Sequence, residues 1–320
     1  MNHYFIKRLL QVIPVLFLTS LFSFIIIGLA PGNIADTFIT DDMTEAEIAE
    51  VYERLDMNGT LAERYIAWLD KIVHGNWGKS LRTDRPVVDE IREKLGNTIL
   101  LMGYAFVLSL VVAIPLGLLS GLKKNTFFDH CVELFTYIGH SIPAFWLSIM
   151  LIVVFTQKLH LLPSGGMRTL DVDSTWDLFK HMIMPGFVLS LGSMARYTRF
   201  IRASTIAQLE EDYVLTARAK GTRPIAVLFR HVMKNTLLPI ITMSGSRLTS
   251  LVVGSFIIES IFGWPGLGSM GKKAITNRDY PLIMAYTLMS CLILIIGNLI
   301  ADMLYGLADP RIKQGVKKER

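Results

Sequence analysis

Six long apolar stretches alternate with polar segments along this chain of 320 residues. Each is long enough to cross a bilayer as a helix, which takes roughly 20 residues. The stretches cover about residues 9–29, 98–119, 132–155, 182–201, 237–258 and 282–304. Five of the six contain a proline, which lipid tolerates where neighbouring helices satisfy the freed carbonyl. The pattern predicts an all-α polytopic membrane protein whose six transmembrane helices pack as a bundle.

Composition and charge agree with a membrane protein and orient it. Hydrophobic residues make up 52% of the chain and charged residues 18%, with a mean hydropathy of +0.44, whereas soluble domains carry about 25% charged residues. Lysine and arginine gather in the segments that face the cytoplasm if the N-terminus is inside. We therefore expect both termini in the cytoplasm. Retention of the cationic loops on the cytoplasmic side and their attraction to anionic lipid explain the excess of basic residues. No nucleic acid is therefore expected as a partner.

The first apolar stretch follows Lys7 and Arg8 and therefore also resembles a signal peptide. A cleaved signal has a shorter apolar core and a small-residue exit of the A-x-A kind. Here the core runs for about 21 residues and ends in Ala30-Pro31-Gly32. We expect an uncleaved first transmembrane helix.

Residues 31–96 form a long polar segment that carries several helix signals. Two capping boxes, in which a hydroxyl and a carboxylate satisfy free amides at a helix start, are Thr44-x-x-Glu47 and Thr60-x-x-Glu63. Apolar residues follow the second box at helical spacing, namely Leu61, Tyr65, Trp68 and Ile72. A third helix is expected to begin at Pro86 and end at Gly96. We expect a small helical extracytoplasmic cap over the bundle, with a solvated decoration as the alternative.

A glycine-rich run at residues 266–272 resembles a phosphate loop. It fits G-x-G-x-x-G and nearly fits the Walker A pattern, but Lys273 stands where that pattern needs Ser or Thr. The run follows an apolar span instead of a strand, and the orientation places it outside the cell. We therefore expect no nucleotide site here, and we expect Trp264 in the headgroup belt of the membrane.

No catalytic or metal-binding constellation is evident in the sequence, so neither an enzyme nor a cofactor is expected. Two ionisable residues lie deep in predicted spans, His140 in the third and Arg247 in the fifth. Such residues are costly in lipid and normally face the bundle interior or an aqueous path. Either could line a translocation pathway, or pair with a neighbouring carbonyl or hydroxyl.

The cytoplasmic loop of residues 207–236 is charged, yet it shows the pattern of a helix. Tyr213, Val214 and Ala217 can share one face, and Gly221 is a suitable terminator. Apolar residues presented beside cations favour docking into a groove of a soluble partner. An amphipathic helix that lies flat on the membrane would explain the pattern equally well.

This loop resembles the coupling loop of ABC importer permeases. The matching residues are Glu211-Asp212-Tyr213, Ala217-Arg218-Ala219-Lys220-Gly221, Arg230-His231, Asn235 and Leu237-Leu238-Pro239. Further matching elements are Phe128-Asp129, Ile142-Pro143-Ala144-Phe145-Trp146, the run 261–268, Arg278-Asp279-Tyr280-Pro281 and Asp309-Pro310-Arg311. The spacing from Gly221 to Pro239 is similar to that of the B-type subunit of the dipeptide, oligopeptide and nickel branch. One departure is Leu215-Thr216-Ala217, where the family has Glu-Ala-Ala.

The resemblance implies a type I ABC importer fold and a subunit without catalysis of its own. It implies a second six-span permease subunit, two cytoplasmic ATPases that bind ATP and Mg²⁺, and an extracytoplasmic substrate-binding protein. The residues implied to couple to the ATPase are Glu211, Asp212, Tyr213, Val214, Thr216, Ala217, Arg218, Ala219, Lys220 and Gly221. We hypothesise that Ala217 and Gly221 are small so that the helix sits close in its groove. Arg247 is not fixed by the family motif.

The expected organisation is a first helix in residues 1–30, a cap in 31–96, a core bundle in 97–306 that includes the coupling loop 207–236, and a basic cytoplasmic tail in 307–320. The resemblance implies a bacterial or archaeal plasma membrane and short peptides as cargo. Nickel or metallophore complexes and glutathione-like peptides are alternatives. A secondary transporter is the alternative from another class, although repeated halves and paired unwound helices are not evident.

Overall fold

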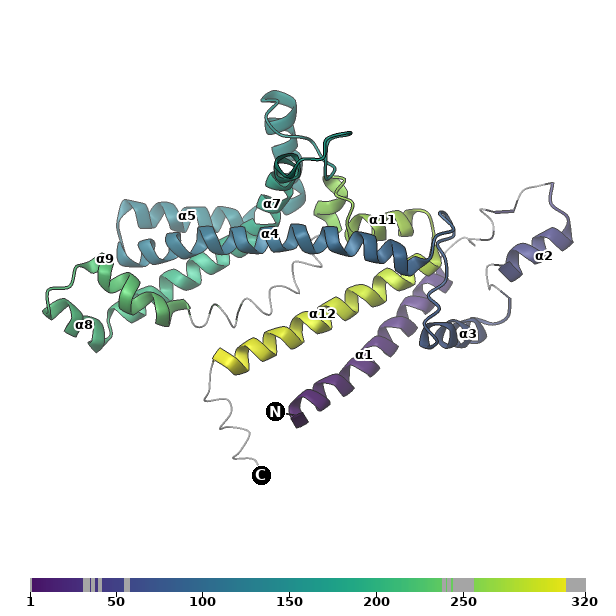
Figure 1. Ribbon diagram of the computed structural model, residues 1–320, viewed down its shortest axis with the longest axis horizontal. Coiled ribbons are helices and arrows are strands. Elements are labelled where there is room, and N and C mark those ends of the chain that lie inside the picture. The colour runs from purple at the N-terminus through teal and green to yellow at the C-terminus, as the bar shows by residue number, and fades with distance from the viewer. Residues whose placement is uncertain are drawn as a thin grey trace. The chain divides into compact units, whose positions relative to one another are not determined.

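The computed structural model describes residues 2–30, 35, 38–39, 42–54, 58–237, 240, 243 and 256–308. These residues are helical without strands, and Lys79 and Pro86 form an isolated β-bridge. The elements in Figure 1 are α1 (Asn2–Leu29), α2 (Glu45–Arg54), α3 (Leu61–Val73), α4 (Val87–Leu122), α5 (Phe127–Ser141), α6 (Ala144–Leu151), the π-helix η2 (Ile152–Lys158), α7 (Thr175–Leu209), α8 (Asp212–Ala219), α9 (Pro224–Val227), the π-helix η3 (Leu228–Val232), α11 (Leu267–Thr276) and α12 (Tyr280–Ala308).

Among the described residues, four helical segments are long and apolar enough to cross a membrane. They lie in α1, α4, α7 and α12, and they correspond to the predicted first, second, fourth and sixth spans. A bent pair, Phe127–Ser141 with Ala144–Lys158, supplies a fifth if it is counted as one span. The predicted fifth span, 237–258, lies largely outside the described residues, so the count of six stays a prediction.

The third predicted span, about residues 132–155, is not one straight helix. The chain bends by 102° between α5 and α6. Ile142 has an extended backbone (φ −72°, ψ 125°) and Pro143 precedes the first turn of α6. The ring of a proline disfavours helical geometry in the residue before it, which ends α5 at Ser141.

A second boundary also differs from its prediction. The helix expected at residues 86–96 is the first part of α4, which continues through Gly96 to Leu122. One interior glycine costs a helix only about 1 kcal/mol relative to alanine. The long apolar run that follows Gly96 outweighs that cost, so the helix does not end there.

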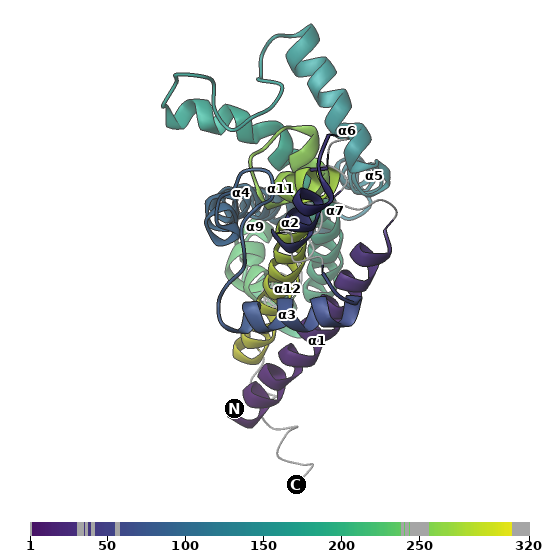
Figure 2. The ribbon, with the colours of Figure 1, turned by 90° about the vertical axis from the view of Figure 1, so that its right-hand side faces the viewer.

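The chain divides into two compact units. The first comprises Met1–Leu95 and Met270–Ile293, and the second comprises Gly96–Ser269 and Leu294–Arg320. In the first unit, α3 crosses α1 (Figure 2). Tyr65 of α3 shares a hydrogen bond of 2.9 Å with the hydroxyl of Ser20, and its ring lies 5.3 Å from that of Phe24.

The predicted capping boxes are present in the first unit. Thr60 accepts the backbone N–H of Glu63 at 3.3 Å, and the carboxylate of Glu63 accepts the N–H of Thr60 at 2.7 Å. Thr44 and Glu47 make the same reciprocal pair. The turn before α4 is attached to the residue that precedes α12, because the hydroxyl of Ser80 donates to the buried carboxylate of Asp279 at 2.6 Å.

The second unit contains a core cluster around the turn that precedes α11. Trp264 is fully buried there, and its indole N–H donates to the carbonyl of Asn97 at 3.0 Å. It packs with Leu101, Ile258 and Phe262. The expectation that Trp264 lies in the headgroup belt is therefore wrong, because this indole finds its hydrogen-bond partner inside the protein.

Candidate coupling site

Helix α8 occupies the predicted place in the loop that follows α7. Glu211 precedes its first turn with an extended backbone (φ −74°, ψ 147°), as expected of an N-cap residue. The helix runs from Asp212 to Ala219 and then reverses into α9, whose first residue is Pro224. Figure 1 shows α8 and α9 together at one end of the second unit.

The end of α8 depends on a left-handed glycine. Gly221 has a φ of +79°, a backbone conformation in which a Cβ is costly. Its N–H donates to the carbonyl of Arg218 at 2.9 Å, and the N–H of Thr222 donates to that of Ala217 at 3.2 Å. These bonds form a Schellman motif. A Cβ on Gly221 would meet nothing within 4 Å, so within this chain the glycine serves the backbone turn and not a close contact.

The face of α8 that was expected to dock elsewhere packs inside its own unit. Val214 is fully buried and Ala217 is 9% exposed. Both join a core cluster with Tyr197, Ile201 and Val227. The prediction that Tyr213, Val214 and Ala217 share a face is confirmed, but that face is occupied by this chain and cannot receive a partner.

Tyr213 holds the start of α8 at the edge of this cluster through two hydrogen bonds. Its hydroxyl donates to the side-chain carbonyl of Gln208 at 2.7 Å and accepts from the amide of Asn235 at 3.3 Å. Gln208 is in the last turn of α7, and Asn235 follows η3. The tyrosine therefore joins the segments on either side of the α8–α9 turn.

The opposite face of α8 is exposed. Asp212 and Ala219 each lie three or four residues from Leu215 and Thr216, which puts these four exposed residues on one side of the helix. Leu215 is 53% exposed, with Arg218 and Lys220 exposed beside it. On the next turns, Ile225 and Phe229 are each 51% exposed. This outer face combines apolar side chains with charges.

Small residues bring α4 against α7 beneath this site. A Cβ on Gly117 would lie 2.6 Å from the Cβ of Ile201, and one on Gly121 would lie 2.7 Å from that of Thr205. Both distances are shorter than any real contact, so only glycine fits at this approach. Gly117-x-x-x-Gly121 is the small-xxx-small spacing that joins helices in membranes. This spacing is visible in the sequence, although it does not identify the partner helix.

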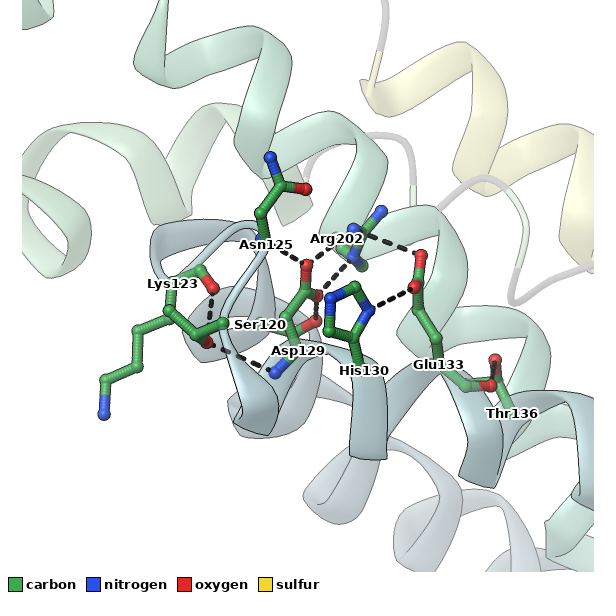
Figure 3. A network of polar contacts seen from close by, with 9 residues as sticks. Ser120, Lys123, Asn125, Asp129, His130, Glu133, Thr136 and Arg202 are labelled. Atoms are coloured by element: carbon green, nitrogen blue, oxygen red, sulfur yellow. Dashed lines mark hydrogen bonds and ion pairs between the residues drawn. The ribbon is translucent and has the colours of Figure 1, made fainter.

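An ion-pair network fastens the same region (Figure 3). Arg202 of α7 donates from Nε to Asp129 Oδ1 at 2.6 Å and from Nη2 to Oδ2 at 2.7 Å. Ser120 also donates to Asp129, and the backbone N–H of Asn125 does so at 2.9 Å. Glu133 lies 3.1 Å from the same guanidinium. Asp129 is fully buried, so its charge is compensated by a bidentate partner and two further donors.

The two pathway candidates from the sequence are not brought together by the described residues. His140 is exposed in the last turn of α5, just before the bend at Ile142. Arg247 lies outside the described residues. Their roles as pathway residues stay predictions.

The glycine-rich run opens helix α11, as a phosphate loop would, but a side chain of this protein occupies the site. The buried carboxylate of Glu259 accepts the backbone N–H of Gly268 at 2.6 Å and that of Ser269 at 3.2 Å. Thr98 donates to the same carboxylate at 2.8 Å. A Cβ on Gly266 would lie 2.5 Å from Glu259 Oε2. The glycines thus admit an internal carboxylate where a phosphate loop would admit a nucleotide.

In the part of the chain that the structure describes, no group of three or more His, Cys, Asp or Glu side chains could hold a metal ion.

Comparison with protein families gives two matches that together cover most of the chain. Residues 1–102 match the N-terminal family of binding-protein-dependent transport system membrane components, and residues 113–314 match the family described as binding-protein-dependent transport system inner membrane component.

Curated relatives align over nearly the full length. The chain is 38% identical to the oligopeptide transport system permease protein AppB of Bacillus subtilis (strain 168), over 98% of this chain and 100% of that one. It is 35% identical to the dipeptide transport system permease protein DppB of Alkalihalophilus pseudofirmus, over 97% and 99%. It is 34% identical to the glutathione transport system permease protein GsiC of Escherichia coli (strain K12), over 98% and 99%.

Among solved structures, the chain resembles the inward-facing MetNI methionine ABC transporter. The TM-score is 0.51 at 18% identity, and the match covers 68% of this chain and 98% of that chain. This likeness shows the type I ABC importer membrane fold.

Proposed function

Because this chain belongs to the family of binding-protein-dependent transport system inner membrane components, we propose that it imports di- and oligopeptides. It is a multi-pass permease subunit of the inner membrane and works with an ATPase and a substrate-binding protein. Two relatives named for oligopeptides and dipeptides, aligned over nearly their whole length, support the peptide cargo. The family match favours an importer of this kind over a secondary transporter.

The second candidate cargo is nickel or a metallophore complex, because the loop resembles that of the dipeptide, oligopeptide and nickel branch. The relative named for glutathione supports a tripeptide-like cargo. Binding of radiolabelled dipeptides, glutathione and nickel to the cognate binding protein separates these cargoes. Peptide binding is the expected result, and binding of nickel alone would overturn the peptide assignment.

The proposed assembly pairs this chain with a second six-span subunit and two cytoplasmic ATPases, with both termini in the cytoplasm. ATP and Mg²⁺ are bound and ATP is hydrolysed on the ATPases. The chain contributes one half of the pathway and a contact through which the nucleotide-driven movement enters the bundle.

The observation that carries the coupling proposal is the two-sided burial of α8. Its inner face is packed through Val214 and Ala217, whereas Leu215 on the outer face is 53% exposed. An ATPase groove that receives Leu215, Thr216 and Ala219 would hold α8 from outside. Because α8 is locked to α7 and α4 from inside, a shift of the ATPase would move these helices as one body.

The test replaces Leu215 and measures coupling in the assembled transporter. Leu215→Asp puts a charge into the proposed groove, and Leu170→Asp is the matched control, since Leu170 is 90% exposed in a loop that the orientation places outside. We expect at least a tenfold loss of substrate-stimulated ATPase activity for Leu215→Asp, with normal membrane insertion. Leu170→Asp should behave as the wild type. Equal coupling in the two variants would refute α8 as the contact.

A further inference from the structure

Helix α3 has an apolar arc that is wider than the surface it covers. One part of the arc packs on α1 through Leu61, Tyr65 and Trp68, and Ile72 lies on the same part of the arc. At about 100° per residue, the arc continues to Ile66 and Val73, which α1 does not cover. Ile66 is 67% exposed and Val73 is 74% exposed.

The polar residues of α3 gather on the other side. The exposed charges there are Glu63, Asp70 and Lys71, and His74 lies 3.4 Å from Asp70 at the C-terminal end. The helix is therefore divided into one polar arc and one apolar arc. Such a division is typical of a helix that lies in the plane of a membrane interface.

The position of α3 along α1 sets its depth. The membrane-spanning segment of α1 ends at Leu29. Trp68 packs against Phe24, at a ring distance of 6.0 Å, and Tyr65 bonds to Ser20. At 1.5 Å per residue, Phe24 lies about 8 Å and Ser20 about 14 Å from Leu29 along the helix axis. The hydrocarbon core is about 30 Å thick, so these contacts lie within the outer half of the membrane.

The surface of α1 next to the exposed flank of α3 indicates what contacts that flank. The helix that α3 crosses is itself a membrane span with exposed apolar side chains, among them Phe22 at 59% and Ile26 at 68%. A span of this kind is surrounded by acyl chains. The apolar arc of α3 is attached to that surface and continues it.

We propose that α3 is a membrane-interface helix of the outer leaflet, with Ile66 and Val73 inserted among lipid acyl chains and its polar arc facing water. The segment expected to be an extracytoplasmic cap then rests partly in lipid. The proposal depends on α1 being a membrane span and is independent of the cargo.

Site-directed spin labelling of the complete transporter in phospholipid nanodiscs tests this proposal. The native cysteines Cys131 and Cys291 are free and are first replaced by serine. Labels are then placed by Ile66→Cys and Val73→Cys on the apolar arc, and by Ala67→Cys and Asp70→Cys on the polar arc. Collision rates are measured with O₂, which concentrates in lipid, and with a nickel chelate, which stays in water.

We expect at least a fivefold higher ratio of O₂ to nickel collisions at positions 66 and 73 than at 67 and 70. High nickel accessibility at all four positions would overturn the proposal in favour of a solvated cap. Low accessibility to both probes at 66 and 73 would also overturn it, because another protein would then cover the flank.

Labelling of the same cysteine variants in intact cells gives an answer that needs no purification. A membrane-impermeant maleimide should modify positions 67 and 70 and spare 66 and 73, since a thiol in lipid remains protonated and unreactive. Full modification at position 73 would contradict insertion. Peptide import by the wild type is measured separately, so failure of the lipid proposal and failure of the cargo assignment are distinguishable.

Discussion

Helices α8 and α3 are both short and both packed on a longer helix, yet they leave opposite kinds of surface uncovered. On α8 Val214 and Ala217 are buried, and a mixed face with Leu215, Thr216 and Arg218 remains exposed. On α3 Tyr65 is buried and Trp68 is partly buried, and the exposed flank with Ile66 and Val73 is apolar.

The difference shows that the external partner of a short helix is indicated by its exposed face, and not by the face that packs within its own unit. The apolar pattern of α8 suggested a docking surface and that of α3 suggested a helix of the cap, but much of each pattern is buried by packing within the same unit. What remains on α8 carries charges beside one large apolar side chain, which suits a protein groove. What remains on α3 is a flank without charge, which suits acyl chains.

The largest predicted effect concerns the support beneath α8. Arg202→Met keeps an unbranched apolar side chain but leaves the buried carboxylate of Asp129 without its charged partner. Breaking a buried ion pair in this way costs about 3–5 kcal/mol. We expect a correspondingly lower melting temperature of the purified transporter and loss of coupled ATPase activity.

Glu133→Gln is the control for this variant, because Glu133 is 33% exposed and contacts the guanidinium from one side. It should cost less than about 1 kcal/mol. The double variant Arg202→Met with Asp129→Asn should recover part of the loss, since the unpaired charge is removed. Equal melting of Arg202→Met and Glu133→Gln would show that the network does not support the site.

The second prediction compares one substitution on the two helices. Ala217→Leu adds three carbon atoms to the packed face of α8 and should destabilise the protein by about 1–3 kcal/mol. Ala67→Leu, on the exposed polar arc of α3, should change stability by less than about 0.5 kcal/mol. Thermal unfolding of the two variants beside the wild type checks both values. If Ala217→Leu unfolds like the wild type but loses ATPase coupling, Ala217 faces the ATPase after all.

The smallest effect concerns acid sensitivity. Hydrogen bonds from the backbone and hydroxyl of Thr60 lower the pKa of Glu63. A lowered pKa means that the carboxylate stabilises α3 fully above the ordinary pKa of glutamate, about 4.3, and that this contribution is lost as the pH falls through the folded-state pKa. Glu211, which precedes α8, makes no capping hydrogen bond through its side chain.

Hydrogen exchange measured across this acid range, and corrected for the intrinsic pH dependence, should therefore show α3 opening as the pH falls. Glu63→Gln should remove that dependence and leave the exchange of α8 unchanged. An unaltered acid response of α3 in Glu63→Gln would contradict the role of this capping box.

Features with local causes were predictable from the sequence. The capping box at Thr60, the helix from Asp212 and its termination at Gly221 all depend on residues a few positions apart, and the structure confirms them. The membrane spans in α1, α4, α7 and α12 follow from length and apolar content alone.

Features with distant partners were missed or misread. The partner of Asp129 is 73 residues away, and the carbonyl that accepts the indole N–H of Trp264 is 167 residues away. No local pattern marks such contacts. The inward face of α8 was misread for the same reason, because the sequence shows that Val214 and Ala217 share a face but not which surface they meet.

Cross-linking in the assembled transporter determines which face of α8 contacts the ATPase. A photoreactive amino acid is placed in turn at positions 214, 215, 216, 217 and 219, and ATPase adducts are quantified. We expect adducts from 215, 216 and 219, with little or none from the buried positions 214 and 217. Adducts from 214 and 217 in place of 215 and 219 would contradict this expectation, because the ATPase would then meet the face that the structure packs against α4 and α7.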